Sequence, residues 1–590
     1  MTRSWWQQYG ILLALVFLAL AIRLWGLDFG LPNLSRVDEQ NISEYSLLRL
    51  LGSCWRGACD LNPHFFEYPS LFIYMTAGAY AAFYTVGQYL GLFQSPADIL
   101  GLYGNDQTSF HVITRFFGAV MGGLTVIPVA LIAQRMAMGN RWVGWLAAAL
   151  LGFCYLHVRD SHFGVTDVPS TLFLAWTLER ASAMAFASSQ GAFQRALRWA
   201  SVFSGLAAGM KYPAGLALFV PLMLVFCRFG RCQPKTALKL AFISTGIAAG
   251  TFIISTPFAM LDTHQFFKDL AYQMDHMAGG HLMNLGKGWL YHARFSLWFG
   301  LQPVGFIVSV LSMAGYALWC ACASDSRKKP VWALHFAFLT FFVACYGFIG
   351  NTLTVFMRYI IVLLPIFVVY SALGVWQLWQ WMQKYTINLR LAQAVMALLI
   401  LATVGPSLWM SLKCSALLAT PDTRVLARQW LLKHLQPNEA VGIGMGLAHL
   451  SLPNTVDKYF LTPLQQEQVG HATNGRGFAP SPLPPMVGKI INNNREYNLS
   501  SYRDPAMMRQ LGIRYFALAV SPLTLFSTPS FELVPIEAIY PRVATFSPMV
   551  NGYFQPPESA FNAIDAFYMP FSTLDHVERP GPEIRIYKVP

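Results

Sequence analysis

The feature that most constrains the fold is the recurrence of long apolar blocks that contain few charges. Three clear examples are Ile11 to Leu20, Val304 to Leu318 and Ala392 to Val404. With their flanks, such blocks approach the roughly 20 residues that a helix needs to cross a bilayer core. The 590 residues are 55% hydrophobic and only 12% charged, which is about half the charge expected of a soluble chain. The sequence therefore predicts an integral membrane protein.

The net charge of +13 comes mainly from short basic loops between the apolar blocks. The basic residues of these loops are Arg135, Arg141, Arg195, Arg198, Arg228, Arg231, Lys235, Lys239, Arg327, Lys328, Lys329, Lys384 and Arg390. Basic loops of this kind stay in the cytoplasm, so they orient the chain in the membrane. No basic stripe interleaved with aromatic residues accompanies them, which excludes a nucleic-acid partner.

Threading the chain from a cytoplasmic N-terminus gives about eleven transmembrane helices. We expect them at about 9–27, 110–133, 142–157, 166–184, 199–210, 213–227, 236–256, 295–320, 331–349, 359–380 and 392–412. The first is a retained span and not a signal peptide, because no small-residue cleavage site follows it. A crossing at Pro69 to Phe93 would put the next basic loop on the wrong side, so we expect this stretch along the outer leaflet.

A pair of half-length helices is expected to meet at Met210-Lys211-Tyr212-Pro213, because proline breaks a helix there. Both flanks of this pair are basic, so Lys211 should lie at the outer end. Because successive spans cross the membrane in alternate directions, every second loop lies outside the cytoplasm: 28–109, 158–165, 257–294, 350–358 and everything after about 413.

The predicted architecture is a polytopic α-helical membrane domain, residues 1–412, followed by a soluble α/β domain, residues 413–590, outside the membrane. In the second domain, Arg424 to Leu435 has helical spacing. Three segments are typical of buried strands: Ala440 to Gly444, Arg514 to Val520 and Glu583 to Val589. The run Gly442-Ile-Gly444-Met-Gly446 lacks the rest of a nucleotide-binding fingerprint and is better explained as a strand that ends in a turn.

The nine cysteines show no spacing typical of zinc sites. Cys54 and Cys59 lie in the first outer loop, where an oxidising compartment would join them. The sequence leaves two possibilities open for this pair: a disulfide or two ordinary thiols. His264, His276, His281 and His292 are spaced irregularly, which favours scattered loop residues over a metal site.

Ionisable residues gather in the predicted outer loops, from at least five separate parts of the chain. The set contains Asp38, Glu39, Glu67, His157, Arg159, Asp160, His162, Asp167, Lys211 and Arg358. Any one of them alone is more often a helix cap or an interfacial anchor. Because ionisable groups near a bilayer are costly, their clustering on one face indicates a functional site.

These residue types fit transfer of a group from a lipid phosphate. A carboxylate such as Asp38 accepts the proton of an attacking hydroxyl. Lys211 and Arg358 are the kind of separated cations that hold a departing phosphate. Glu67 suits binding of a metal or of the acceptor.

At these residues the sequence resembles the polytopic, lipid-carrier-dependent glycosyltransferases of the GT-C fold, the group with the protein O-mannosyltransferases and the aminoarabinose transferases. The resemblance rests on motifs in the same order along the chain. They are Arg36-Val-Asp38-Glu39, Phe66-Glu67-Tyr68-Pro69, His157-Val-Arg159-Asp160-Ser161-His162 with Asp167-Val-Pro169, Gly209-Met-Lys211-Tyr-Pro213, Arg358-Tyr359 before Leu364-Pro365, and Asp422-Thr-Arg424 with Trp430.

The resemblance implies an inverting transfer of a sugar from a polyprenyl-phosphate donor to an acceptor at the outer face of the inner membrane, with juxtamembrane helices in 28–109. Asp38 would be the general base, with Glu39 beside it. The phosphate would be bound by Arg159, Lys211, Arg358 and Tyr359. The substrates would be organised by Glu67, His157, His162 and Asp167. No cofactor is certain, and a divalent metal stays open because relatives differ in metal dependence.

One departure from the aminoarabinose transferases is Tyr68, where those enzymes carry lysine between Glu67 and Pro69. The change removes one expected phosphate contact, for which Arg159 or Lys287 would have to substitute. It also weakens lipid A as the acceptor, which stays open as a protein, a lipid or a glycan.

Two alternatives belong to other functional classes. A membrane transporter or lipid flippase would also keep buried charges and broken helices, but it should show charges near the mid-bilayer and an internal repeat. An inactive assembly subunit would tolerate substitution of Asp38 and Lys211. The gathering of charges at the outer ends of the spans favours the enzyme.

Overall fold

The computed structural model describes residues 5–32, 37–281, 283–321, 329–385, 388–436, 439–444, 495–498, 505–550, 559–565 and 567–590. Four residues named above, Arg36, Arg327, Lys328 and Gly446, lie outside this range. The chain divides into two compact units. The helical unit contains Met1–Leu27, Ile42–Ala79 and Ile113–Ser415. The second unit contains Asp28–Asn41, Tyr80–Val112 and Ala416–Pro590.

Helices account for nearly all regular structure before residue 420. The α-helices are α1 Trp5–Leu24, α2 Val37–Glu44, α3 Gly52–Trp55, α4 Leu71–Tyr89, α5 Pro96–Asn105, α6 Thr108–Leu124, α7 Val126–Met136, α8 Arg141–Gly152, α9 Tyr155–Asp160, α10 Asp167–Ala185, α11 Gln190–Met210, α12 Phe219–Val225, α13 Pro234–Ser255, α14 Phe258–Leu261, α15 Thr263–Gly279, α16 Gly288–Tyr291, α17 Trp298–Gly300, α18 Pro303–Ala321, α19 Lys329–Asn351, α20 Leu364–Lys384 and α21 Leu389–Leu418. Shorter 3-10 and π segments are η1 Tyr45–Leu51, η2 Tyr212–Leu218, η3 Phe226–Gly230, η4 His292–Leu297 and η6 Met357–Leu363.

Six helical segments of the described residues are long and apolar enough to cross a membrane. They are Thr108–Met136, Tyr212–Gly230, Pro234–Ser255, Pro330–Asn351, Met357–Lys384 and Leu389–His434. A bent pair, Gly288–Gly300 with Pro303–Leu318, raises the number to seven if it is one span. The chain is therefore an integral membrane protein, and the number of about eleven spans stays a prediction.

The structure corrects two expected helices. The segment 295–320 was expected as one transmembrane helix, but its chain turns by 116° between Gly300 and Pro303. Pro303 cannot continue the preceding helix, and Gln302 takes a left-handed backbone with φ 63°. The helix before Lys211 is not half-length either. It begins at Gln190, where the side chain of Ser189 accepts a hydrogen bond from the Ala192 amide and caps it.

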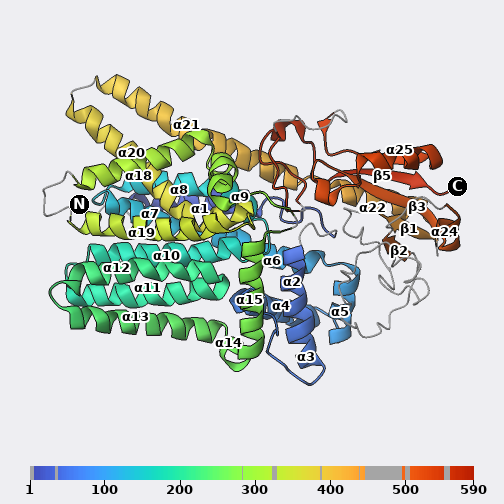
Figure 1. Ribbon diagram of the computed structural model, residues 1–590, viewed down its shortest axis with the longest axis horizontal. Coiled ribbons are helices and arrows are strands. Elements are labelled where there is room, and N and C mark those ends of the chain that lie inside the picture. The colour runs from blue at the N-terminus through green and yellow to red at the C-terminus, as the bar shows by residue number, and fades with distance from the viewer. Residues whose placement is uncertain are drawn as a thin grey trace. The chain divides into compact units, whose positions relative to one another are not determined.

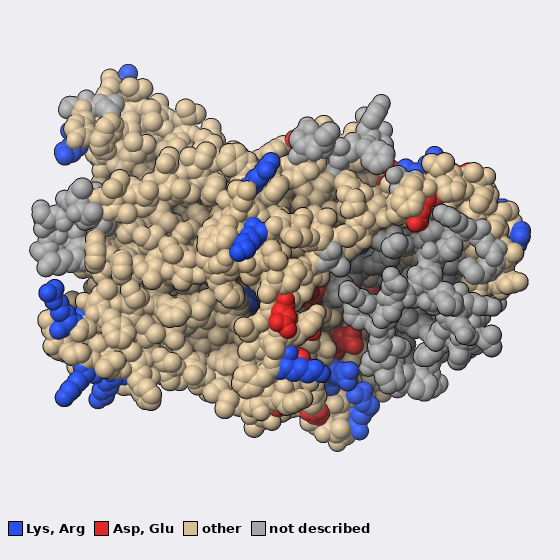
Figure 2. Space-filling model, viewed as in Figure 1, with Lys and Arg blue, Asp and Glu red and all other residues tan. Residues whose placement is uncertain are grey.

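The long helices of the helical unit pack in neighbouring layers (Figure 1). Helices α10, α11, α12 and α13 lie side by side, and α11 packs against both α10 and α13. Helix α15 runs across the direction of this group in the same view. Figure 2 shows Lys and Arg at the left end of this unit, followed by a broad band without charged side chains. That distribution is the one expected of helices whose basic loops face the cytoplasm.

The second unit contains a five-stranded sheet in the order β2-β1-β3-β5-β4. Its strands are β1 Ala440–Ile443, β2 Arg495–Asn498, β3 Ile513–Val520, β4 Arg542–Phe546 and β5 Glu583–Lys588. Its helices are α22 Thr423–His434, α24 Pro505–Gln510 and α25 Ser530–Ile539, with short 3-10 turns at Thr524–Phe526 and Leu574–His576. Strand β1 is parallel to β2 and β3, whereas β5 is antiparallel to β3 and β4. The predicted helix at 424–435 and the three predicted strands are confirmed.

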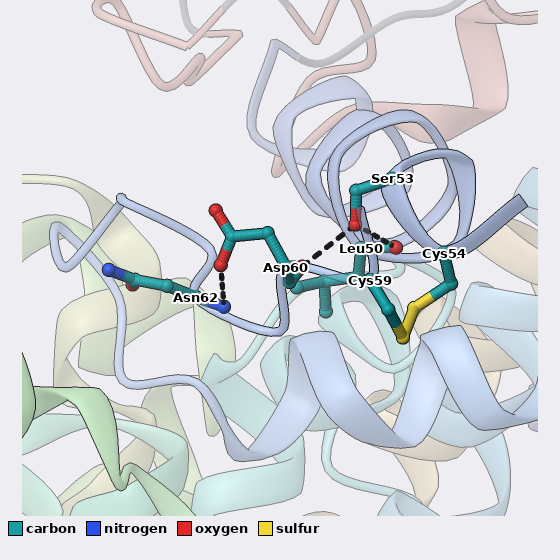
Figure 3. The surroundings of a disulfide bond; sticks show 6 residues. All are labelled: Leu50, Ser53, Cys54, Cys59, Asp60 and Asn62. Atoms are coloured by element: carbon teal, nitrogen blue, oxygen red, sulfur yellow. Dashed lines mark hydrogen bonds between the residues drawn. A yellow bond between two sulfur atoms is a disulfide. The ribbon is translucent and has the colours of Figure 1, made fainter. Parts of the chain in front are cut away.

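The Cys54 and Cys59 side chains form a disulfide (Figure 3). Beside it, the Ser53 hydroxyl donates to the carbonyls of Leu50 and Asp60 at 2.8 and 2.9 Å. The disulfide and these bonds close the turn that joins α3 to the segment 60–70. Of the two readings left open above, the structure has the disulfide.

Reduction of this disulfide should destabilise the turn by about 2 kcal/mol, the chain-entropy estimate for a closed loop of about six residues. We expect Cys54 and Cys59 to resist alkylation until a reductant is added, and the Cys54→Ser/Cys59→Ser double variant to unfold at a lower temperature in detergent. Cys227 and Cys232 are exposed free thiols with the same spacing in sequence, and their double serine variant is the control. Alkylation of Cys54 and Cys59 without reductant would contradict the expectation.

Candidate functional site

A carboxylate and two cations from three different segments meet at the start of α10. Asp167 is the first residue of α10, where a negative charge is favoured by the helix N-terminus. Its Oδ1 atom accepts a hydrogen bond from the Lys211 ammonium, and its Oδ2 atom lies 3.8 Å from Arg358 Nε. Asp167 is 4% exposed and Arg358 is 7% exposed, so these charges interact in a medium that screens them little.

Local sequence explains why the two cations reach this point. Lys211 follows the last turn of α11 in an extended conformation. The next helical run begins at Tyr212, and Pro213 is its second residue, a position where proline is tolerated. Arg358 lies in η6, the 3-10 segment that leads into α20. The structure thus brings Lys211 and Arg358, two of the predicted phosphate-binding residues, to the same carboxylate, Asp167.

Aromatic rings border this cluster, which we call the cation cluster (Asp167, Lys211, Arg358 and Tyr359). The Lys211 ammonium lies 4.9 Å from the centroid of the Tyr359 ring. The Arg358 guanidinium lies 4.0 Å from the Phe356 ring and 5.9 Å from Tyr359. Rings at these distances stabilise a cation without neutralising it. The cluster can therefore still attract an anion.

The polar segment before Asp167 is buried, although it was expected as an outer turn. Arg23 at the end of α1 donates to the carbonyls of Ala19, Gly152 and Leu151 and to the Ser161 hydroxyl at 2.8 to 3.3 Å. His157 Nδ1 lies 3.0 Å from the same guanidinium. His162 is hydrogen-bonded to the Val158 and Trp25 carbonyls. These bonds join α1 to α8 and α9.

Arg159 and Asp160 form a buried ion pair, with Nη1 and Oδ2 separated by 3.0 Å. Arg159 also lies over the Phe163 ring at 5.8 Å. His157 and His162 thus contribute to the packing of α9 against the end of α1, and Arg159 pairs with its neighbour in α9. Their roles toward a substrate stay predictions.

Glu67 lies in a segment without helix or strand, residues 62–67, that is attached to α15. The Gln273 amide donates to Glu67 Oε2 at 3.1 Å, and Asp269 Oδ2 accepts from the Phe66 amide at 2.7 Å. From another direction, the Tyr212 hydroxyl donates to the Phe66 carbonyl at 2.8 Å. Because Tyr212 directly follows Lys211, the segment that carries Glu67 contacts the segment that carries one cation of the cluster.

The start of segment 62–67 forms a second polar junction with α15. The Asn62 side chain donates to Asp262 Oδ2 at 2.7 Å, and His64 lies between Asp60 and Asp262 at 2.8 and 3.2 Å. Hydrogen bonding by the Asn62 side chain, aided by the Gln265 amide, lowers the pKa of Asp262. The Asn62 backbone amide, aided by His64, lowers the pKa of Asp60. Both carboxylates are therefore in their charged, bonded form at neutral pH.

Asp38 and Glu39 lie in the first turn of α2, Asp38 half-buried and Glu39 buried, and they belong to the second unit. In the described part of the chain, no group of three or more His, Cys, Asp and Glu side chains has the geometry of a metal site. His276 and His281 instead pack ring against ring at 4.9 Å, and His281 lies 5.1 Å from Phe356.

Sequence reasoning missed Arg23, Asp269 and Gln273. Arg23 was visible as a cation at the end of an apolar block, a position that calls for buried acceptors. Asp269 and Gln273 share one face of a helix with Asp262 and Gln265, and this spacing of three or four residues was the available signal. Their partners lie about 200 positions earlier in the chain, and no local pattern identifies them.

The chain is similar in structure to several solved proteins. An oligosaccharyltransferase from Archaeoglobus fulgidus, in complex with Zn and sulfate, matches with 13% identity over 91% of this chain and 72% of that one, at a TM-score of 0.44. ArnT from Cupriavidus metallidurans in the apo state matches with 16% identity over 76% of this chain and 84% of that one, also at 0.44. The same protein bound to undecaprenyl phosphate matches with 18% identity over 75% and 84%, at 0.41.

No protein-family model and no curated protein sequence matches the chain. The predicted resemblance is confirmed to the extent that the chain is similar to an oligosaccharyltransferase and to ArnT. The function proposed below rests on the residues of the site.

Substitution of Asp167 by asparagine should destabilise the helical unit by about 3 kcal/mol, because it leaves two partly buried cations without this counter-charge. Thermal unfolding in detergent measures the loss. The double variant Asp167→Asn/Lys211→Ala should recover part of it, since one cation is gone. Asp275 is exposed on α15, and Asp275→Asn is the matched control. An Asp167→Asn protein as stable as the wild type would show that the carboxylate does not hold the cluster together.

Proposed function

We propose that the chain is a lipid-carrier-dependent glycosyltransferase, which moves a sugar from a polyprenyl-phosphate donor to an acceptor at the outer face of the inner membrane. The observation that carries the proposal is the cation cluster. Lys211 and Arg358 come from separate helical runs and converge on Asp167 beside the Tyr359 ring. Two such cations in a poorly screened site suit a phosphate whose charge grows as it leaves.

In the proposed reaction an acceptor hydroxyl attacks the anomeric carbon of the sugar. The new bond joins the acceptor oxygen to that carbon, the bond from the carbon to the phosphate oxygen breaks, and the configuration inverts. Asp38 takes the proton of the acceptor, with Glu39 as its neighbour. Lys211 and Arg358 stabilise the negative charge that develops on the leaving phosphate.

The other predicted residues receive supporting roles. Asp167 keeps the two cations together, and Tyr359 lies beside them where the phosphate would bind. Glu67 orients the acceptor. Arg159 binds the donor phosphate, and His157 and His162 organise the substrates, from a buried segment in which Arg159 pairs with Asp160 and His157 lies beside Arg23. The reaction as written needs no metal, and a divalent ion at Glu67 is an addition that a metal titration would test.

We further propose the orientation in which the N-terminus is cytoplasmic and the second unit is outside. The basic loops at one end of the helical unit support it. The polyprenyl carrier and the surrounding bilayer lipids are then the membrane partners, and the acceptor is a protein, lipid or glycan outside the cytoplasm.

Purified protein in detergent should release free polyprenyl phosphate when polyprenyl-phosphate-linked sugars are added one at a time. Asp38→Asn should lower the rate by about a hundredfold or more, the contribution of a general base. Lys211→Ala should lower it by a similar factor, because it removes a donor to the phosphate. Chromatography of the released lipid phosphate measures both effects, and Asp275→Asn is the exposed control.

In this assay water can take the place of the acceptor substrate. If it does not, crude membrane extract is added to supply the acceptor. Release by the wild type that both substitutions abolish, with folded protein still recovered, is the expected result. Lack of release from every donor, with extract present, would favour the transporter or lipid flippase, whose test is movement of labelled lipid across a vesicle membrane.

A further inference from the structure

No residue of helix α15 is buried. One face of the helix is polar, and this face contacts other segments of the helical unit. The residues of that face are Asp262, Gln265, Asp269 and Gln273, which follow one another at three or four positions. Asp262 caps the helix and accepts from the Asn62 amide group, and Gln265 donates to Asp269 at 2.8 Å. Spacing of this kind places side chains on one side of a helix. Segment 62–67 therefore lies along α15 over three turns.

The aromatic side chains of this junction fix the segment further. Phe266 packs against Phe66 with ring centroids 5.7 Å apart and against Tyr212 at 6.1 Å. Phe66 thus has Phe266 of α15 and Tyr212 of η2 as neighbours. Glu67, the next residue, leaves this packing as a half-buried carboxylate bonded to Gln273.

The other end of α15 is attached to the segment that leads to Arg358. The amides of Leu353 and Thr354 donate to the Met277 carbonyl at 3.0 and 3.3 Å. The Thr354 hydroxyl donates to the His276 carbonyl at 2.5 Å. Just beyond, His281 packs against Phe356, the ring beneath the Arg358 guanidinium. One helix therefore contacts both the Glu67 segment and the Arg358 segment.

We propose that Gln273 is a positioning residue that holds the Glu67 carboxylate at a fixed place relative to the cation cluster. Helix α15 provides this positioning, because it contacts both the Glu67 segment and the Arg358 segment. The inference deepens the proposed transferase function and rests on it for its kinetic consequence. Gln273 contacts neither the sugar donor nor the acceptor substrate, and it acts on the reaction through Glu67.

The bond from Gln273 to Glu67 is one between a neutral donor and a charged acceptor, and its loss removes one of the contacts that hold the carboxylate in position. In the release assay with a polyprenyl-phosphate sugar as donor and water as acceptor, Gln273→Ala should lower kcat about tenfold. The donor KM should stay within about twofold, because Lys211 and Arg358 still bind the phosphate. Asp275→Ala, an exposed change two residues along the same helix, should alter neither value.

A second variant separates positioning from general damage to the helix. Gln273→Glu places two carboxyl groups within hydrogen-bond distance, and such a pair shares one proton with a raised pKa. The shared proton restores the bond at low pH, and its loss as the pH rises makes the groups repel. The ratio of the variant's kcat to the wild type's should therefore increase as the pH falls from about 7.5 to about 5.5. A ratio that does not change with pH would overturn the positioning role.

Hydrogen exchange gives a readout that needs no activity. Gln273→Ala should speed exchange of the backbone amides in 66–68 by several-fold, whereas Asp275→Ala should leave them unchanged. If these amides exchange at the wild-type rate, the inference is wrong whatever the enzyme does. If they exchange faster but no donor is cleaved by the wild type, the positioning contact stands and the proposed function has failed.

Discussion

The ionic bond between Asp167 and the two cations is the interaction on which the arrangement of the helical unit depends most. It joins the first turn of α10, the junction between α11 and η2, and the 3-10 segment before α20. Lys211 follows the last turn of α11 in an extended conformation, and Arg358 lies in a 3-10 segment, so neither belongs to a regular α-helix. Both cations approach the same carboxylate, which offsets their mutual repulsion. The lysine ammonium has three donors, and one bond to Asp167 leaves it able to bind a second anion.

A second polar centre, around Arg23, supports the first from inside the unit. Its guanidinium is fully buried, and its acceptors come from α1, the end of α8 and the turn after α9. A buried cation is tolerated only when carbonyls and side chains satisfy it. The chain between Arg23's partner Ser161 and Asp167 is short, so the position at which α10 begins follows from this scaffold. The polar residues of 157–162 therefore contribute to the site through its geometry.

Much of the fold followed from local patterns in the sequence. Apolar length located most of the long helices, and short apolar runs located β1, β3 and β5. Proline chemistry correctly placed the break at Lys211 but not the bend at Gln302, because a proline inside an apolar block permits a kink, a turn or an ordinary first turn. The burial of 157–162 was missed because polar composition suggests exposure, whereas here Arg23, backbone carbonyls and an internal ion pair bind side chains of the segment.

The cation cluster and the surroundings of Glu67 were predictable from the sequence to different extents. Charge clustering identified Lys211, Arg358 and Asp167, since a buried or interfacial charge is unusual wherever it occurs. The partners of Glu67 were not predictable, because polar residues on an amphipathic helix normally face water. Asp269 and Gln273 face the chain only because segment 62–67 lies along them, and that segment is distant in sequence.

The contrast between the cation cluster and the surroundings of Glu67 has a physical consequence for the proposed reaction. Arg358 lies in a segment that is almost entirely buried and Lys211 is partly buried, whereas Glu67 is bonded to a helix with no buried residue. Elements held by hydrogen bonds at exposed positions open locally at a lower free-energy cost than elements of the core. Segment 62–67 is bonded to α15 at several points while its Phe65 and Phe66 side chains are buried, so opening of α15 would release the polar contacts of the segment first. A transferase needs a phosphate that stays bound until the bond breaks and an acceptor that enters and leaves, and this distribution of burial suits both requirements.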